Sequence, residues 1–251
     1  MTTQTLIQLR QLKLSGMANA LQTQMEQVGT YEGLPFIERF DLLLDQESLS
    51  RDQRKQERLI RQAKFKLRAS VQEIDYQHPR NITQSQIARL AQCDWINRAQ
   101  NLLVTGPCGS GKTYLACALG HNACLHGYSV RYYRLSRLLL ELTQAKADGT
   151  YHKQLKLLAK IQCLVIDDWG LEPLKPAHRN DLMEIMDDRH GSTSTLMISQ
   201  LPTDQWYASI SDNTLADAIL DRLMHNAHRL PLKGESMRKR MGLLTDSEHL
   251  G

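Results

Sequence analysis

Residues 106–113 read Gly106-Pro107-Cys108-Gly109-Ser110-Gly111-Lys112-Thr113. The fixed positions match G-x-x-x-x-G-K-[ST], in which glycines let the backbone wrap an anion and the lysine adds a positive charge. An apolar run at residues 101–105 precedes the octapeptide and predicts a buried strand. Residues 114–126 then carry apolar side chains at helical spacing, and Gly127 suits the left-handed residue that ends a helix. This order of strand, glycine-rich turn and helix predicts a loop that binds the phosphates of a nucleoside triphosphate.

Each residue of this loop has an expected role. The three glycines would form the phosphate cradle, and the residues between them would contribute backbone groups: Gly106, Gly109 and Gly111, with Pro107, Cys108 and Ser110. Lys112 would reach the β- and γ-phosphates, and the hydroxyl of Thr113 would bind Mg²⁺.

A second apolar run, at residues 163–166, ends in two carboxylates, Asp167 and Asp168. In a phosphate-loop protein, a central strand is expected to deliver an acid to the metal at its carboxyl end. Asp167 would hold Mg²⁺ through water, and Asp168 would orient or deprotonate the attacking water. The guanine-reading pattern Asn-Lys-x-Asp does not occur in the chain. The expected cofactors are therefore ATP and Mg²⁺.

Two further polar groups follow apolar segments. The run at residues 195–198 leads to Ser199 and Gln200, either of which could position water beside the γ-phosphate. A helix is predicted over residues 214–226, with Arg222 away from its apolar side. An arginine there could reach the ATP of a neighbouring subunit.

Bulk composition narrows the class of protein. The 251 residues carry a formal net charge of +4, which permits a nucleic-acid partner without requiring one. No apolar run approaches the length of a membrane span, and the first residues lack the pattern of a signal peptide. The five cysteines never stand at C-x-x-C spacing, which indicates reduced thiols rather than a zinc site. We expect a cytoplasmic protein without a membrane partner.

The first part of the chain is predicted to be helical. Residues 6–28 fit one amphipathic helix, and Pro35 opens a second that could extend through a charged stretch. Residues 51–68 hold eight basic and two acidic side chains, whereas residues 1–50 hold three basic and six acidic ones. The basic stretch is a candidate for contacts with DNA phosphates, although a solvated helix face would have the same pattern. Its candidate residues are Arg51, Arg54, Lys55, Arg58, Arg61 and Lys64.

Beyond a connector at residues 69–80, strand candidates alternate with helical stretches. The candidates lie at residues 101–105, 129–134, 162–167, 194–199 and 228–232. This alternation predicts an α/β domain with a five-stranded parallel sheet flanked by helices. We therefore predict a small all-helical domain at residues 1–68, for contacts with DNA or a partner, and an ATPase domain at residues 69–251.

Several segments together resemble one known family. They are residues 14–18, 38–40, 106–113, 164–170, 199–202, 217–229 and 234–240. In these segments the chain resembles the IstB-like transposition helper ATPases, which belong to the AAA+ class and are related to the DnaC helicase loader and the DnaA initiator. The resemblance implies an AAA+ fold, ATP-dependent self-assembly on double-stranded DNA, and presentation of that DNA to a partner transposase.

The same resemblance assigns roles to single residues. It makes Arg222 the arginine that acts on a neighbour's ATP, Gln200 the sensor beside the γ-phosphate, and Arg238 a candidate second sensor. It also implies a helical insertion at residues 136–160, where Arg137, Lys153 and Lys156 could contact DNA phosphates.

The sequence differs from the usual AAA+ pattern in two respects. Asp168 occupies a position where glutamate is usual, so hydrolysis is expected to be slow or conditional. We also expect no C-terminal lid domain after the last predicted strand. Subunit packing would then have to complete the nucleotide site.

These observations lead to a hypothesis with two rivals. The favoured function is an ATP-dependent DNA-binding ATPase that forms a homo-oligomer on double-stranded DNA, without reading its sequence, and assists a transposase. A helicase loader of the DnaC type would use the same core. A small-molecule kinase would use the same phosphate loop but would show no DNA-stimulated hydrolysis.

Overall fold

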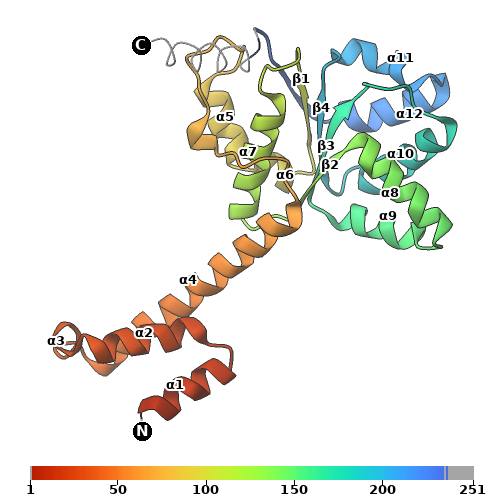
Figure 1. The fold of residues 1–251 in the computed structure, drawn as a ribbon. Helices are drawn as coiled ribbons and strands as arrows, with labels where there is room; N and C mark the ends of the chain where they lie inside the picture. The colour runs from red at the N-terminus through yellow and green to blue at the C-terminus, as the bar shows by residue number, and fades with distance from the viewer. Residues whose placement is uncertain (1, 235, 237–251) are drawn as a thin grey trace, which may run out of the picture. The chain divides into compact units, whose positions relative to one another are not determined.

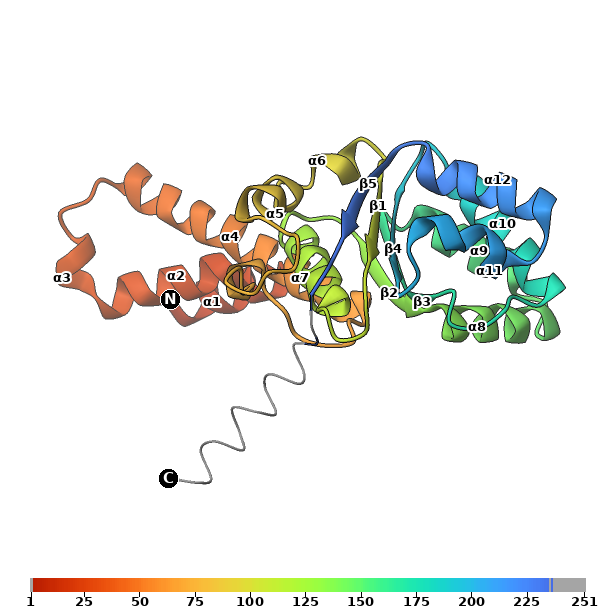
Figure 2. The ribbon, with the colours of Figure 1, turned by 90° about the horizontal axis from the view of Figure 1, so that it is seen from above.

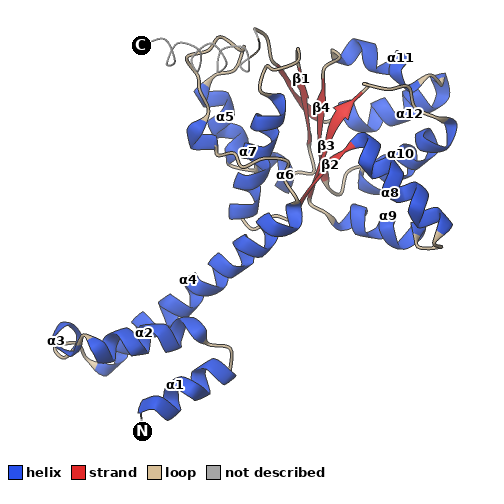
Figure 3. Cartoon of the chain, in the orientation of Figure 1, coloured by secondary structure: helices blue, strands red, loops and turns tan. Residues whose placement is uncertain are grey.

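Five parallel strands form a single sheet in the order β2-β3-β4-β1-β5 (Figure 3). The computed structural model describes residues 2–234 and 236. The strands are β1 (Asn101–Thr105), β2 (Val130–Arg134), β3 (Cys163–Trp169), β4 (Ser194–Ser199) and β5 (Ala227–Pro231). All five lie within two residues of the predicted limits, and the parallel arrangement is confirmed. The apolar runs of β1, β3 and β4 are a sufficient local signal because these central strands are buried on both faces.

Helices cover both faces of this sheet (Figures 1 and 2). They are α5 (Gln84–Ala91), α6 (Asp94–Asn97), α7 (Lys112–Leu125), α8 (Leu135–Ala147), α9 (Tyr151–Lys160), α10 (Pro176–Arg189), α11 (Trp206–Ile210) and α12 (Asn213–Met224). Two short 3-10 helices, η1 (Val71–Glu73) and η2 (Thr203–Gln205), lie in the connections. The predicted helical insertion after the second strand is confirmed as α8 and α9.

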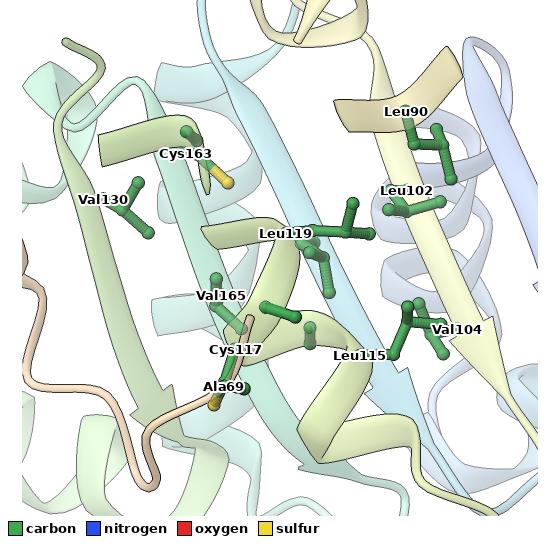
Figure 4. Close-up of a cluster of buried hydrophobic side chains, with 14 of the residues drawn as sticks. Ala69, Leu90, Leu102, Val104, Leu115, Cys117, Leu119, Val130, Cys163 and Val165 are labelled. Carbon is green, nitrogen blue, oxygen red and sulfur yellow. The ribbon is translucent and has the colours of Figure 1, made fainter. Parts of the chain in front are cut away.

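Two hydrophobic cores result, one on each face of the sheet. On the first face, Leu115 and Leu119 of α7 pack among Leu102, Val104 and Val165 (Figure 4). On the second, side chains from α8 to α12 pack on alternate residues of the same strands, such as Leu103 and Ile166. The alternation follows from the two-residue period of a strand. The layered core fixes the carboxyl ends of the strands, where the phosphate-binding loop begins.

Helix ends follow local chemistry. Thr83 and Gln86 form a reciprocal capping box at the start of α5. Pro176 occupies the first turn of α10, and the Asp212 side chain accepts a hydrogen bond from the Leu215 N–H at the start of α12. Gly127, with φ of 85°, follows the end of α7 as predicted.

The chain divides into two compact units, Met1–Arg58 and Leu59–Gly251. The division falls inside α4 (Phe36–Ala63), whereas the sequence-based boundary was placed after residue 68. The first unit also contains α1 (Thr2–Gln11), α2 (Ser15–Glu26) and α3 (Val28–Tyr31). The prediction that Pro35 opens a helix running through the charged stretch is confirmed by α4.

The predicted single helix over residues 6–28 is wrong, because the chain breaks between α1 and α2. Lys13 adopts the left-handed conformation there, with φ of 60°. Gly16 then lets α2 approach α4 closely, since a Cβ at this position would lie 2.6 Å from the carbonyl oxygen of Gln46. The carboxylate of Glu47 accepts hydrogen bonds from the Gly16 and Met17 N–H groups at 2.7 and 3.2 Å. A tertiary contact within this unit therefore defines where α2 starts, and helical periodicity alone does not contain that information.

Among the described residues, no helix is long and apolar enough to cross a membrane. Four of the five cysteines are buried thiols, and Cys108 in the phosphate-binding loop is exposed.

Candidate nucleotide-binding site

The loop at residues 106–113 joins β1 to α7 at the carboxyl end of the sheet. Gly111 is the N-cap residue of α7, with φ of 88°, and no side chain caps this helix end. The first N–H groups of α7 therefore remain open toward the loop, and the helix dipole places partial positive charge there. This geometry suits the phosphate groups of a nucleotide.

Two side chains of the loop support the same assignment. The Lys112 Nζ donates hydrogen bonds to the carbonyl oxygens of Gly106 and Pro107, both at 2.7 Å, so the lysine is folded over the loop. The hydroxyl of Ser110 is fully buried and has no hydrogen-bond partner among the described residues. A buried polar atom of this kind is destabilising unless a ligand satisfies it. The loop thus brings together a cation, N–H groups without a side-chain cap and a buried hydroxyl that a ligand could satisfy.

Asp167 is the centre of the polar contacts beside this loop. Its Oδ2 accepts hydrogen bonds from the Thr113 hydroxyl at 2.9 Å and from the Tyr132 hydroxyl at 2.6 Å. The Lys66 Nζ lies 4.0 Å from the same oxygen. Asp167 is only 2% exposed, so these neighbours compensate the loss of water around its charge. Burial, followed by the contact with Asp167, raises the pKa of Tyr132, which therefore stays protonated and donates.

Thr113 and Asp167 fit the predicted Mg²⁺ site chemically. Hydroxyl and carboxylate oxygens are the ligands that Mg²⁺ prefers, with phosphate oxygens and water completing the shell. Residues 2–234 and 236 contain no group of three or more His, Cys, Asp or Glu side chains that could hold a metal alone. A cation here would accordingly be bound jointly by these two side chains and the nucleotide.

Asp168 lies at an irregularity in the sheet. The register between β3 and β4 shifts between Ile166 and Trp169, and Asp168 adopts φ of 66°. This bulge turns its carboxylate toward Arg134, whose Nε lies 3.5 Å from Oδ2. The Asp168 side chain is 30% exposed and so remains accessible to water.

Ser199, the last residue of β4, and Gln200, which follows it, differ in their hydrogen bonding and exposure. The Ser199 hydroxyl donates to the Trp169 carbonyl at 2.8 Å and accepts from the Leu201 N–H at 3.0 Å. Ser199 is therefore engaged in holding the strand end, which removes it as a water-positioning candidate. Gln200 is exposed at the same edge of the sheet as the loop.

Arg222 lies at the opposite edge of the sheet. The Asn101 side chain, at the amino end of β1, donates to the Arg222 carbonyl at 3.1 Å, whereas the phosphate-binding loop follows the carboxyl end of that strand. The length of β1 separates the two by about 13 Å. The guanidinium pairs with the exposed Asp187 through Nε and Nη2, at 2.8 and 2.7 Å. It also lines a cavity of about 130 Å³ with Asn101 and His225. Arg222 therefore lies far from the loop at residues 106–113 of its own chain.

The candidate DNA-contacting residues are all exposed, but they are not equivalent. In the first unit, Arg51 and Arg54 pair with the buried carboxylate of Glu47 at 2.8 and 3.3 Å, so part of their charge is neutralised. The remaining candidates of the basic stretch and of the insertion form no described ion pair: Lys55, Arg58, Arg61, Lys64, Arg137, Lys153 and Lys156. Arg238, the candidate second sensor, lies outside the described residues.

The model of the family "IstB-like ATP binding protein" matches residues 7–244. The chain belongs to this family. One relative is the "Putative insertion sequence ATP-binding protein y4pL" of Sinorhizobium fredii. It is 44% identical to this IstB-like protein over 235 residues, and the match covers 94% of this chain and 96% of y4pL. A protein of insertion sequence IS1162 from Pseudomonas fluorescens, also named for ATP binding, is 48% identical over 204 residues, covering 81% and 88%.

Solved structures identify the fold of this IstB-like protein. The crystal structure of DnaI matches with a TM-score of 0.56 at 20% identity, covering 67% of this chain and 90% of that one. The crystal structure of the DnaC helicase loader matches with a TM-score of 0.53 at 21% identity, covering 66% and 97%. At such identities the likeness shows the fold alone. The IstB-like protein is thus an ATP-binding protein with the α/β fold of these AAA+ domains.

Sequence reasoning missed three side chains at the candidate site. Tyr132, Lys66 and Arg134 all contact the tandem carboxylates, and none belongs to a recognisable motif. The register of β2 against β3 pairs Arg134 with Asp167, which brings the end of β2 to the site. The available sequence signal was the strand candidate at residues 129–134, which ends in Arg134.

Proposed function

We propose that this protein is a Mg²⁺-dependent ATPase that self-assembles on double-stranded DNA and assists a partner transposase. Curated relatives that match most of the chain belong to insertion sequences, which supports a role in transposition. The formal net charge of +4 and the exposed basic side chains support contact with a nucleic-acid backbone rather than with bases.

The observation that carries the proposal is the distance between Arg222 and the phosphate-binding loop. Because they occupy opposite edges of the sheet, one chain holds an arginine that its own ATP cannot use. In a head-to-tail assembly, the amino edge of one subunit would meet the carboxyl edge of the next. Arg222 would then neutralise charge on the neighbour's γ-phosphate. Bound ATP would thereby link two subunits, and the assembly would depend on ATP.

The proposed hydrolysis uses the residues around Asp167. Mg²⁺, when bound by Thr113 and Asp167, would neutralise charge on the β- and γ-phosphates. Asp168 would orient or deprotonate the attacking water, and Gln200 would act as the sensor beside the γ-phosphate. The Arg134 side chain competes for the Asp168 carboxylate, so hydrolysis is expected to be slow until assembly rearranges this pair.

Binding of DNA would depend on nucleotide through the oligomer. A single subunit offers few phosphate contacts, whereas an array multiplies them along the duplex. Hydrolysis removes the γ-phosphate that two subunits share, and the array would loosen.

The test is binding of the full chain to a fluorescent duplex without nucleotide, with ATP, with ADP and with a non-hydrolysable ATP analogue. Tight, length-dependent binding is expected with ATP and the analogue, and weak binding in the other two conditions. Equal binding in all four would overturn ATP-controlled assembly. Co-purification with a replicative helicase instead of a transposase would replace the partner with that of a helicase loader.

A further inference from the structure

Arg80 is a buried arginine without a counter-charge in the described part of the chain. It lies in the loop between η1 and α5 and is 4% exposed. Its Nη2 donates to the carbonyl oxygen of Asp75, while its Nε is buried without a hydrogen-bond partner in residues 2–234 and 236. Arg80 takes part in none of the ion pairs found between described residues. A guanidinium stays charged at any physiological pH, so its burial is unfavourable unless something compensates it.

A second buried arginine shows what full compensation looks like in this fold. Arg189, 2% exposed, donates to the Leu158 carbonyl at 2.5 Å, to the Ile161 carbonyl at 2.8 Å, and to Thr195 Oγ1 at 3.1 Å. It also donates to the Ser194 carbonyl. Arg189 therefore has a structural role, joining the ends of three elements. Arg80 lacks such a set of acceptors, and a purely structural role leaves its burial unexplained.

The guanidinium of Arg80 lies against the start of α7. A Cβ added to Gly111 would approach Nη1 to 2.7 Å, so the glycine both adopts its positive φ and leaves room for the arginine. Gly111 is the N-cap of α7, where the helix dipole is positive, and Lys112 follows it directly. The Arg80 guanidinium and the positive end of the α7 dipole therefore lie side by side at the loop that also carries Lys112. A bound anion would offset the charge gathered there.

The backbone around Arg80 fixes it at this edge of the sheet. The Lys233 N–H donates to the Arg80 carbonyl oxygen at 3.0 Å, and the Asn81 side chain donates to the Pro231 carbonyl at 3.0 Å. Pro231 ends β5, the neighbour of β1, which leads into the phosphate-binding loop. The backbone of Arg80 is therefore anchored at this edge, and its guanidinium is held by the Asp75 carbonyl oxygen. Such anchoring before a ligand binds lowers the entropic cost of binding.

We propose that Arg80 is a second cationic ligand of the bound nucleotide's phosphates, acting from the same chain beside Lys112. A guanidinium presents two parallel donors that match phosphate oxygens, whereas an ammonium is a point charge. Arg80 and Arg222 then have separate roles: Arg80 binds nucleotide within one subunit, and Arg222 acts between subunits. This inference rests on the placement of ATP at residues 106–113.

The test compares R80Q and R80K with three controls: R189Q for a structural buried arginine, R89Q for an exposed one, and K112A for the loop itself. For each full-length variant, the melting temperature without nucleotide is measured first. The affinities for ATP, ADP and adenosine are then measured by displacement of a fluorescent adenine nucleotide.

We expect R80Q to weaken ATP and ADP binding by about tenfold or more and to leave adenosine binding unchanged, because the lost contacts are to phosphate. R80K should fall between R80Q and the wild type. The melting temperature of R80Q without nucleotide should stay the same or rise, whereas that of R189Q should fall. R89Q should resemble the wild type.

Two results would overturn the role of Arg80: ATP affinity of R80Q within about twofold of the wild type, or an equal loss of ATP and adenosine affinity. If R80Q does not fold, R80K decides by the same comparison. The control K112A separates the two levels of the proposal. Unchanged ATP binding in K112A would overturn the loop as the nucleotide site, whereas loss in K112A alone would overturn only Arg80.

Discussion

The hydroxyl of Tyr132 donates a hydrogen bond of 2.6 Å to Oδ2 of Asp167, the same oxygen that accepts from Thr113. Tyr132 lies on β2 and Asp167 on β3, so the contact joins neighbouring strands where the metal is expected. A second residue that holds a metal-binding carboxylate orients it before the cation arrives. Tyr132 is therefore a positioning residue for the proposed Mg²⁺ site.

The variant Y132F tests this role because it removes only the hydroxyl and keeps the buried ring. We expect the Mg²⁺ concentration needed for half-maximal hydrolysis to rise by about tenfold or more, while ATP affinity without Mg²⁺ changes little. Titration of Mg²⁺ in an ATPase assay measures the first quantity. The matched control is Y133F, whose ring packs in the core on the other face of the sheet. Equal Mg²⁺ dependence in Y132F and the wild type would contradict the assignment.

Asp168 gives a second prediction. In D168N the carboxylate charge is lost, but asparagine tolerates the left-handed backbone that the bulge requires. ATP binding should persist, and hydrolysis should fall by about a hundredfold or more if Asp168 activates water. Single-turnover hydrolysis with radiolabelled ATP measures this. R134Q, which removes the side chain that competes for Asp168, should retain or increase hydrolysis. A rate in D168N close to that of the wild type would exclude Asp168 as the base.

What the sequence predicted well depends on local patterns. The phosphate-binding loop and the five strands are encoded in short contiguous segments, because glycine spacing and buried apolar runs need no knowledge of the rest of the chain. Tyr132, Lys66 and Arg80 were missed because their partners lie far away in sequence. Tyr132 meets Asp167 only through the register of β2 on β3. Arg80 meets Gly111 only because the segment before α5 bonds to the end of β5.

The break between α1 and α2 was missed for a similar reason. The apolar spacing of residues 6–28 continues across Lys13, so periodicity alone predicts one helix. The deciding contact is the Glu47 carboxylate on the Gly16 and Met17 N–H groups, which comes from α4, a later helix of the same unit.

That contact yields a third prediction, on pH dependence. Burial raises the pKa of Glu47, but the hydrogen bonds from Arg51, Met17 and Gly16 outweigh it and leave the pKa below the ordinary 4.5. A lowered folded-state pKa means that the stabilisation is complete above about pH 4.5 and is lost as the pH falls through the folded-state value. E47Q should lower the stability of the first unit by about 1–2 kcal/mol at pH 7. It should also flatten the loss of helical signal between about pH 5 and pH 3, relative to the wild type.

Circular dichroism during urea titration at several pH values measures both effects. E57Q is the matched control, since Glu57 is an exposed glutamate of the same helix and forms no described ion pair. A parallel loss of stability in E47Q and E57Q, or an unchanged pH profile in E47Q, would show that the carboxylate of Glu47 does not cap α2.

DNA binding provides a fourth prediction. Arg51 and Arg54 are paired with Glu47, whereas Arg58, Arg61 and Lys64 are exposed without such a partner. If the basic stretch contacts DNA phosphates, the triple variant R58Q/R61Q/K64Q should bind duplex DNA more weakly. The slope of log affinity against log salt concentration should become shallower by about 2–3. K153Q/K156Q tests the insertion in the same way. Anisotropy titrations at several salt concentrations give the slopes, and an unchanged slope in either variant would remove that segment from the interface.

The last prediction concerns Arg222. Its variant distinguishes hydrolysis that needs an arginine from a neighbouring subunit from hydrolysis that one subunit performs alone. R222A should bind ATP as the wild type does, because the guanidinium is at the far edge of the sheet from its own loop. Its DNA-stimulated hydrolysis should fall by about a thousandfold.

Asp187 holds Arg222 through a surface ion pair worth less than about 1 kcal/mol, so D187N should release the arginine and keep or increase hydrolysis. Mixing R222A with K112A completes the test: each variant alone is inactive, but interfaces that combine an intact loop with an intact arginine should restore part of the activity. Full hydrolysis by R222A alone, or no recovery in the mixture, would contradict catalysis across a subunit interface.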